Sequence, residues 1–293
     1  MKIVDILYLS LYGVLKFFVW CLPYKLLMAL ARGIALLAYA LNYKHRKIIK
    51  ANLRFCFPQK DEKQIKIIAL KIYKNFARFA FDMLKNKNAN KEYIKKLVSI
   101  ENKEFLQAAF ETKRTLIFTT AHYGCWELIP LVYASHFGAI SVVTRTLDSK
   151  VMNDLLVQNR TKNFDVELID KIGAAKKMLL AIKNKRTLGI LTDQDASDNE
   201  SMVLEFFGKK VNWNVGASVI AKKSDALLIP AFIYQKNGKY AVRCFEAMDA
   251  TKHSKEELTL YQAKSCEEMI KFKPDEYFFF HKRFKRFYNE IYE

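Results

Sequence analysis

The sequence predicts an α/β protein: a mixed, partly parallel sheet flanked by helices, preceded by an N-terminal hydrophobic, membrane-attached helical segment. Three observations lead to this prediction. Short apolar, β-prone runs alternate with helical stretches between residues 116 and 272. From residue 6 to residue 43 the chain is almost continuously apolar. The composition of the 293-residue chain, 51% hydrophobic and 14% aromatic, excludes a disordered or collagen-like protein.

The N-terminal apolar region consists of two runs, 6–22 and 26–43, on either side of Pro23. Each run is close to the roughly 20 residues that cross a bilayer as a helix. The region is too long for a cleaved signal peptide and is interrupted by Lys16 and Arg32, although it contains an A-x-A segment like a cleavage site. We therefore predict a retained membrane anchor, with a buried helix pair and a signal peptide as the alternatives.

Basic residues follow the apolar region directly and are abundant in the whole chain. Lys and Arg number 49 against 30 Asp and Glu, a formal net charge of +19. Because positive flanks stay on the cytoplasmic side of a membrane, we expect an anchoring segment over 1–58 and a cytoplasm-facing α/β domain over 59–293. The charge also suits a nucleic-acid-binding protein, but the basic residues are spread along the chain and no nucleic-acid motif appears. Five widely spaced cysteines indicate a reducing compartment rather than a disulfide framework.

The elements follow from the hydrophobic pattern. Residues 60–111 carry apolar positions spaced among Lys and Asn, which predicts two or three amphipathic helices. Beyond them strands and helices alternate, as in a partly parallel sheet. Lys236-Asn237-Gly238 is a turn signal, so the last two strands should form a hairpin. The expected strands are 116–120, 140–143, 166–169, 188–191, 227–234 and 240–245, and the expected helices are 126–136, 149–163, 173–184, 213–224 and 256–272.

His122 lies where the first of these strands ends, the position at which open α/β sheets bind their ligands. Glu127 follows five residues later. On one continuous helix this spacing separates side chains by about 140°, but the two can meet if His122 lies in the strand-to-helix turn. A carboxylate on the imidazole would fix its tautomer and support general-base action on a hydroxyl. The competing interpretation is a loop histidine, with a glutamate that only favours the helix dipole.

Two further chemistries use residues of the same turn. Cys125 beside His122 would be a nucleophile pair, although cysteine is more often a small buried hydrophobe. A metal site made of His122, Glu127 and Asp193 lacks a second clustered histidine, so we expect neither a metal nor a cofactor. Dinucleotide-binding, P-loop and serine-elbow motifs are absent from the sequence.

A second polar cluster follows the strand 188–191, again at a carboxyl end, and contains Asp193 and Gln194. Residues of these types at such a position are either ordinary turn formers or site residues. Arg145 follows the strand 140–143, and Arg160 lies in the expected helix 149–163. Each arginine is a candidate for binding phosphate, with a plain surface charge as the alternative.

The blocks around these residues, together with two further ones, resemble the bacterial lipid A late acyltransferase family in type and in their order along the chain. The segment HYGCWEL, beginning at His122, is similar to the H-x4-[DE] block of glycerolipid-type acyltransferases and to the H-F-G-N-W-E form of this family. The spaced Arg145 and Arg160 match two arginines of the family. Asp193-Gln194 followed by Phe206-Phe207-Gly208 is similar to its D-Q…F-F-G block. The segment YFFFHKRFK, beginning at Tyr277, is similar to its closing aromatic-H-x-R-[WF] block.

The resemblance implies an acyltransferase of the bacterial inner membrane with its active site on the cytoplasmic side. Such an enzyme would move a fatty acyl chain from acyl carrier protein to a hydroxyl of a lipid A precursor, a glycolipid acceptor. By the same resemblance, His122 would deprotonate the hydroxyl and Glu127 would orient the imidazole. Substrate binding would fall to Arg145, Arg160, Asp193 and Gln194.

Other functions remain as alternatives to this one. An acyltransferase acting on a phospholipid or another glycolipid would share the same chemistry, and the intact His122–Glu127 pair argues against an inactive lipid-binding homologue. The expected partners are acyl carrier protein, the glycolipid acceptor and inner-membrane lipids, and no nucleic acid. The C-terminal tail interleaves phenylalanines with basic residues over 278–287. Aromatic rings favour the headgroup level and basic residues favour an anionic surface, so we expect this tail to lie on the membrane.

Overall fold

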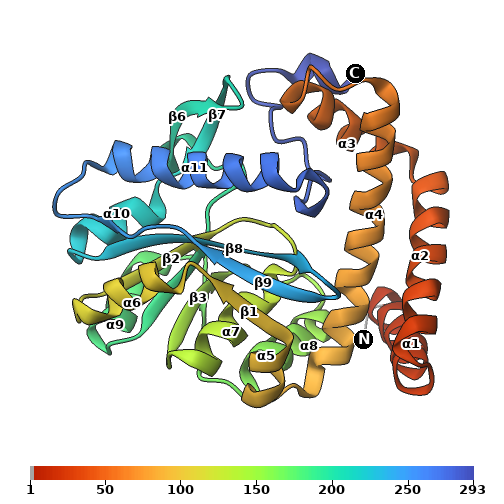
Figure 1. The fold of residues 1–293 in the computed structure, drawn as a ribbon, viewed down its shortest axis with the longest axis horizontal. Coiled ribbons are helices and arrows are strands. Elements are labelled where there is room, and N and C mark those ends of the chain that lie inside the picture. The colour runs from red at the N-terminus through yellow and green to blue at the C-terminus, as the bar shows by residue number, and fades with distance from the viewer. Residues whose placement is uncertain (1–2) are drawn as a thin grey trace.

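The computed structural model describes residues 3–293. An eight-stranded sheet is covered by helices on both faces, and the N-terminal helices stand along one side of it next to a long helix (Figure 1). A separate two-stranded hairpin lies beyond the long C-terminal helix that covers one of the faces (Figure 1). The predicted α/β fold class is therefore confirmed.

The main sheet contains the six predicted strands and two short additional ones. Its strands are β1 (Val98–Glu101), β2 (Leu116–Thr120), β3 (Ile140–Thr144), β4 (Val166–Asp170), β5 (Thr187–Leu191), β8 (Leu227–Lys236), β9 (Lys239–Cys244) and β10 (Met248–Asp249). The order is β1-β9-β8-β2-β5-β3-β4, with β10 paired to β8. From β8 to β4 all neighbours are parallel, as expected where helices connect the strands. β9 returns antiparallel to β8 through Asn237 and Gly238, which both have positive φ, as the turn signal predicts.

Helices cover the two faces of the sheet and continue along its side. The helices are α1 (Ile3–Cys21), α2 (Tyr24–Leu41), α3 (Tyr43–Cys56), α4 (Glu62–Lys85), α5 (Lys91–Leu97), α6 (Lys103–Glu111), α7 (Ile129–His136), α8 (Lys150–Thr161), α9 (Ala174–Lys183), α10 (Gly216–Lys223) and α11 (Lys255–Phe272). One core cluster lies between the sheet and α5, α6 and α7, and another lies between the opposite face and α9, α10 and α11. The region expected to form two or three amphipathic helices thus forms α4, α5 and α6, with β1 between the last two.

Two of the expected helices differ from the prediction. Residues 213 and 214 belong to a strand, because β6 (Ser201–Phe206) and β7 (Lys209–Asn214) form a hairpin that the sequence pattern did not indicate. Phe207 and Gly208 make its turn with φ of 54° and 67°. The following helix therefore begins at Gly216, whose N–H donates to the Asn214 side chain. The helix expected over 126–136 begins with a 3₁₀ turn, Trp126–Leu128, which leads into α7.

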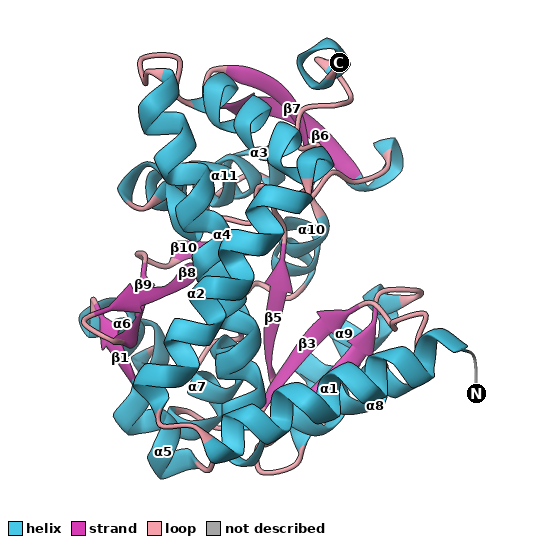
Figure 2. Cartoon of the chain, turned by 90° about the vertical axis from the view of Figure 1, so that its right-hand side faces the viewer, coloured by secondary structure: helices cyan, strands magenta, loops and turns pink. Residues whose placement is uncertain are grey.

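The two N-terminal helices pack against the α/β domain along one face each. On α2, a stripe of Leu27, Ala31 and Ala35 is buried; its first two residues cluster with Phe81 of α4. α1 packs against α4 and α8, and lies alongside α8 in Figure 2. The Asp5 carboxylate accepts a hydrogen bond of 2.6 Å from the Ser149 hydroxyl. The opposite faces of both helices are apolar and exposed. Their exposed side chains include Leu7, Leu11, Phe17, Trp20, Leu26, Leu36, Leu37 and Leu41.

The predicted membrane anchor is partly supported by these helices. Within residues 3–293, α2 is the one helix that is long and apolar enough to cross a membrane, judged by length and composition. The boundary predicted near residue 58 stays a prediction. Although α3 lies before that boundary, its Ile49 and Leu53 share a core cluster with Trp213 and Phe279 of the later region.

Only part of the C-terminal tail lies on the surface, where Lys285, Arg286 and Phe287 are exposed. Tyr277, Phe279 and Phe284 are each only 1% exposed, and Arg283 is buried between Phe206 and Trp213. In the extended segment 277–280 the side chains alternate, so that Phe278 and Phe280 point outward. The Asn52 side chain of α3 donates to the carbonyls of Phe279 and His281 and holds this segment in place. Composition does not reveal this alternation, so the sequence did not separate the buried from the exposed aromatic residues, and contact of the exposed ones with the membrane stays a prediction.

Candidate active site

His122 lies in the turn that follows β2, and the C-terminal tail holds this turn. The N–H of Phe278 donates to the His122 carbonyl at 2.9 Å, and the N–H of Gly124 donates to the Glu276 carbonyl at 2.8 Å. Gly124 has φ of +56°, and a Cβ atom there would lie 2.0 Å from the carbonyl oxygen of Ile233 in β8. Only glycine fits this close approach, so the turn is fixed between β8 and the tail.

Asp193 is the acidic partner of His122. Its Oδ1 lies 2.8 Å from Nδ1 of the imidazole, and the two side chains are 0% and 22% exposed. The contact arises because β2 and β5 are parallel neighbours, so the residues after their carboxyl ends meet at one edge of the sheet. With Nδ1–H donating to the carboxylate, Nε2 is left to act on a substrate. The amide nitrogen of Gln194 is 3.4 Å from this Nε2.

Glu127 does not contact the imidazole, which corrects the expectation that it would orient His122. Its two carboxylate oxygens accept from Nε and Nη2 of Arg160 at 2.6 and 2.7 Å, and the indole of Trp126 also donates to it. Nη1 of Arg160 donates to the hydroxyl of Thr144 at 3.0 Å. Glu127 points to α8 because it sits in the 3₁₀ turn before α7. The Arg160 guanidinium is thereby engaged inside the protein, and its binding of a substrate phosphate stays a prediction.

The charges of the site act on one another across short distances. Burial opposes the ionisation of Asp193, but the positive charge of His122 and its hydrogen bond outweigh it and lower the pKa of the carboxyl to about 2. Burial likewise disfavours the charged imidazole, yet the charge and hydrogen bond of Asp193, followed by the charge of Glu127, raise the pKa of His122. Glu127 thus influences His122 through its field and not through a direct bond.

Beneath Asp193 the tail contributes two enclosed polar side chains, Tyr277 and His281. The Tyr277 hydroxyl, both ring nitrogens of His281 and Oδ2 of Asp193 make no hydrogen bond of normal geometry with any residue in 3–293. Burial is the main reason that the pKa of His281 falls to about 4, so this imidazole is neutral at pH 7. Apart from the closing block itself, no pattern in the sequence indicates this placement.

A cleft of ≈ 570 Å³ opens beside His122 at the carboxyl edge of the sheet. Arg145 lies on its rim with a side chain that is 73% exposed and 3.2 Å from Asp148, so this guanidinium is accessible from solvent. Gln194, Glu127 and Arg160 also line it, together with Lys171. Its floor is apolar and consists of Val143, Met178, Ile190, Val219 and Ile220. Asp195 and Glu200 line it as well, so the cleft combines an apolar floor with a polar rim of mixed charge.

The alternative chemistries of this turn find little support. The Cys125 thiol is buried, and burial raises its pKa well above the ordinary value, so at neutral pH it is a thiol rather than a nucleophilic thiolate. Within residues 3–293, no group of three or more His, Cys, Asp or Glu side chains is arranged to hold a metal ion.

Comparisons with known proteins agree with the sequence blocks. A family model described as bacterial lipid A biosynthesis acyltransferase matches residues 2–286. The lipid A biosynthesis lauroyltransferase of Escherichia coli (strain K12) is 24% identical over 275 residues, which cover 90% of this chain and 87% of that relative. Among solved structures, a 1-acyl-sn-glycerophosphate acyltransferase from Thermotoga maritima matches 84% of this chain and 95% of its own length, with 15% identity and a TM-score of 0.40.

Proposed function

This chain belongs to the bacterial lipid A biosynthesis acyltransferase family, and we propose that it transfers a fatty acyl chain from acyl carrier protein to a hydroxyl of a lipid A precursor. The observation that carries the proposal is the His122–Asp193 pair, bonded at 2.8 Å beside a cleft with an apolar floor and a charged rim that includes three basic side chains. Such a pair suits the activation of a hydroxyl, and such a cleft suits an amphiphile that carries phosphate.

The reaction follows from the unprotonated Nε2 of His122, which the Gln194 amide approaches at 3.4 Å. The acceptor hydroxyl gives its proton to Nε2 while its oxygen attacks the carbonyl carbon of the acyl thioester. Asp193 stabilises the imidazolium that forms. When the carbon–sulfur bond of the tetrahedral intermediate breaks, the imidazolium returns the proton to the departing thiolate of the carrier. His122 thus ends in its starting state, and no covalent acyl-enzyme is required.

Glu127 and Arg160 would support this step from the side of the cleft. Their bidentate pair fixes the position of α8 relative to the His122 turn, and Glu127 adds negative charge near the imidazolium. Arg145 on the rim would attract a phosphate of the acceptor, because its guanidinium is accessible from solvent.

The enzyme would work on the cytoplasmic surface of the inner membrane. The exposed apolar faces of α1 and α2 would enter the membrane, while their opposite faces stay packed on α4 and α8. Since α2 packs on α4 through residues spaced from Leu27 to Ala35, we expect α1 and α2 to lie in the interface rather than to cross the bilayer.

The test is an assay of the purified full-length protein in detergent. Acyl-carrier-protein thioester and lipid A precursor are supplied, and the product is identified by its mass increase of one acyl group. Parallel reactions with acyl-coenzyme A as donor and with a lysophospholipid as acceptor test the choice of each substrate. Transfer to the lysophospholipid but not to the lipid A precursor would overturn the proposal in favour of the alternative acceptor.

A further inference from the structure

We propose that Tyr277 is a positioning residue for the reaction: its buried hydroxyl donates to Oδ2 of Asp193 and thereby holds Oδ1 of this carboxylate against the imidazole of His122. Tyr277 opens the closing block of the sequence, which the proposed reaction does not otherwise use. The inference rests on the proposed function and deepens it, because it gives the His122–Asp193 pair a further member that comes from the C-terminal tail.

The backbone of Tyr277 is fixed beside the turn that carries His122. Tyr277 forms an isolated antiparallel bridge with Tyr123, and the N–H of the next residue, Phe278, donates to the His122 carbonyl at 2.9 Å. Asp193 meets the same turn through its contact with the imidazole. Tyr277 and Asp193 therefore reach one turn from two distant parts of the chain.

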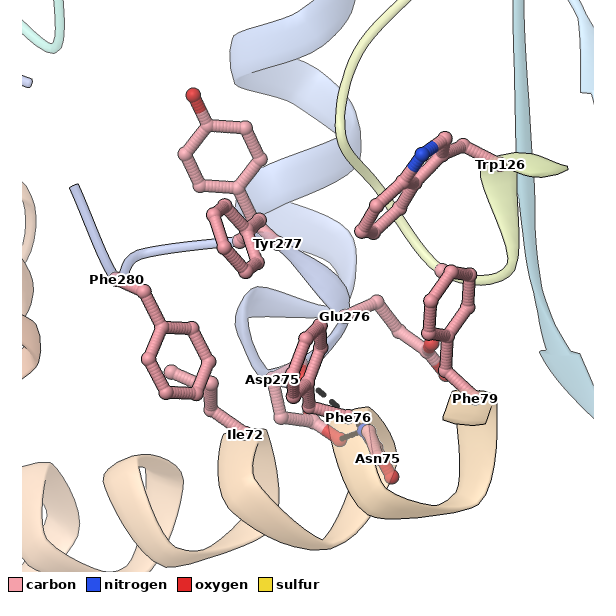
Figure 3. Close-up of a pocket in the computed structure, with 11 residues that line it drawn as sticks. Ile72, Asn75, Phe76, Phe79, Trp126, Asp275, Glu276, Tyr277 and Phe280 are labelled. Carbon is pink, nitrogen blue, oxygen red and sulfur yellow. Dashed lines mark hydrogen bonds between the residues drawn. The ribbon is translucent and has the colours of Figure 1, made fainter. Parts of the chain in front are cut away.

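The side chain of Tyr277 points into the protein. Figure 3 shows its ring directed away from Phe76 and Phe79 of α4, with the hydroxyl at the far end. Tyr277 is 1% exposed, and the side chain of Asp193 is 0% exposed. The hydroxyl and the carboxylate are thus both enclosed, and solvent cannot take the place of a protein partner for either of them.

The hydroxyl and the carboxylate act on each other. Burial is the main cause that raises the pKa of Tyr277 well above its ordinary value, the charge of Asp193 is the next cause, and a hydrogen-bond contact with Asp193 adds to both. Tyr277 therefore keeps its proton near neutral pH. Because an ionised carboxylate only accepts hydrogen bonds, the hydroxyl is the donor in this contact. No residue in 3–293 offers either the hydroxyl or Oδ2 a hydrogen bond of normal geometry, so each remains for the other.

His281 lies next to this contact but does not compete for Asp193. Its ring centroid is 6.2 Å from that of Tyr277. Burial is the main reason that the pKa of His281 falls to about 4, so its imidazole carries no charge at pH 7. His122 is then the one imidazole in this cluster that shares a proton with the carboxylate, and Oδ2 is left to the Tyr277 hydroxyl.

A hydrogen bond to Oδ2 would control the rotation of the carboxylate. The torsion that turns the carboxyl group of an aspartate has a broad energy minimum, so one contact on Oδ1 does not fix it. A donor on Oδ2 would keep Oδ1 at 2.8 Å from Nδ1 of His122. The imidazole would then keep its proton on Nδ1 and present Nε2 to the acceptor hydroxyl.

Packing alone does not explain a tyrosine at this position. Tyr277 belongs to a core cluster in which Cys266, Phe279 and Phe284 are its buried neighbours in type and environment. A phenylalanine would fill the same space without a polar atom, and a buried hydroxyl that lacks a well-formed hydrogen bond destabilises a folded protein. The hydroxyl is therefore better explained by its action on Asp193 than by stability.

The experiment is Tyr277→Phe in the full-length protein. We expect kcat to fall about tenfold, as for the loss of a hydrogen bond to a charged group, while the KM of each substrate stays within about twofold. The melting temperature should not fall, because only the enclosed hydroxyl is removed. An unchanged kcat, or a rise in KM alone, would overturn the proposal.

Tyr133→Phe is the matched control. Tyr133 is 7% exposed, and its hydroxyl is 2.7 Å from that of Thr187, which lies at the start of β5 and so at the opposite end of this strand from Asp193. We expect this variant to lower the melting temperature and to leave kcat within about twofold of the parent. An equal fall in kcat in both variants would make the effect of Tyr277→Phe a general one and overturn the proposal.

A double-mutant cycle tests whether Tyr277 acts through Asp193. The effect of Tyr277→Phe on kcat is measured in the parent and in Asp193→Asn. If the hydroxyl works by holding the carboxylate, the tenfold effect should shrink to less than about twofold in the Asp193→Asn protein. An equal effect in both proteins would show that Tyr277 acts independently of Asp193, and the proposal would be wrong.

A spectroscopic measurement separates this inference from the proposed function. The proton on Nδ1 of His122 should give a downfield NMR resonance, assigned by its loss in His122→Ala, and Tyr277→Phe should broaden it through faster exchange while Tyr133→Phe should not. If this change occurs but no acyl transfer is found, the positioning role stands and the proposed reaction fails. A resonance that is absent from the parent, or unchanged in Tyr277→Phe, would overturn the positioning role even in an active enzyme.

Discussion

Two pairs of a basic and an acidic side chain line the carboxyl edge of the sheet, and they differ in the number of hydrogen bonds that join their members. Asp193 contacts His122 through Oδ1 alone, whereas Glu127 uses both oxygens on Arg160. An arginine keeps its proton at every accessible pH, but an imidazole exchanges its proton near neutrality. The His122–Asp193 pair is therefore suited to transfer a proton. The Arg160–Glu127 pair is suited to fix the positions of the site's elements and to keep their charges in place.

The largest effect that tests this contrast comes from His122→Ala. Removal of the general base should lower kcat by about 10²- to 10⁴-fold, and the melting temperature should fall by a few degrees, because the buried Asp193 carboxylate loses its partner. Turnover measured with the thioester and lipid acceptor, together with a thermal melt, checks both parts. Near-parental turnover in a folded variant would show that the His122–Asp193 pair does not transfer the proton.

Glu127→Gln should act mainly on stability. It leaves the Arg160 charge in a nearly buried position without its carboxylate, which typically costs about 3–5 kcal/mol. We expect the melting temperature to fall by roughly 10 °C. The double variant Glu127→Met/Arg160→Met should recover most of this loss, since it removes both charges. A stable Glu127→Gln protein that has lost all activity would instead give Glu127 a direct part in the chemistry.

Asp193→Asn should change the pH dependence of catalysis. In the proposed mechanism His122 acts as a base in its neutral form, so kcat/KM should rise as the pH passes above the pKa of the imidazole. Asp193 raises that pKa, and its replacement should therefore move the rise to lower pH while lowering the maximal rate. A pH profile of kcat/KM for both proteins checks this. The same replacement of Glu127 should move the rise less, because Glu127 acts only through its charge.

Cys125→Ala should produce the smallest effect. The thiol is buried and protonated, and it belongs to neither pair. We expect kcat within about twofold of the parent and a stability loss of about 1 kcal/mol from the smaller side chain. Complete loss of acyl transfer in a folded protein would instead support Cys125 as the nucleophile.

The sequence predicts six strands of the sheet because each is a short apolar run between polar turns or helices. It misses β1, β10 and the β6–β7 hairpin, because these strands are very short or alternate apolar with polar residues instead of forming continuous apolar runs. At the site, the strand end identifies His122, but the spacing within one segment suggested Glu127 as its partner. Asp193 is the partner because β5 lies beside β2, and that neighbour relation depends on the order of strands in the whole sheet.

The hydrogen bonds between the His122 turn and the tail connect residues 122–124 with residues 276–278, more than half the chain away. Contacts between such distant segments form late in folding, because a large loop must close first. The His122 turn should therefore become rigid only after residues 276–278 have docked against it, and the proposed active site would be among the last parts of the protein to take its final shape.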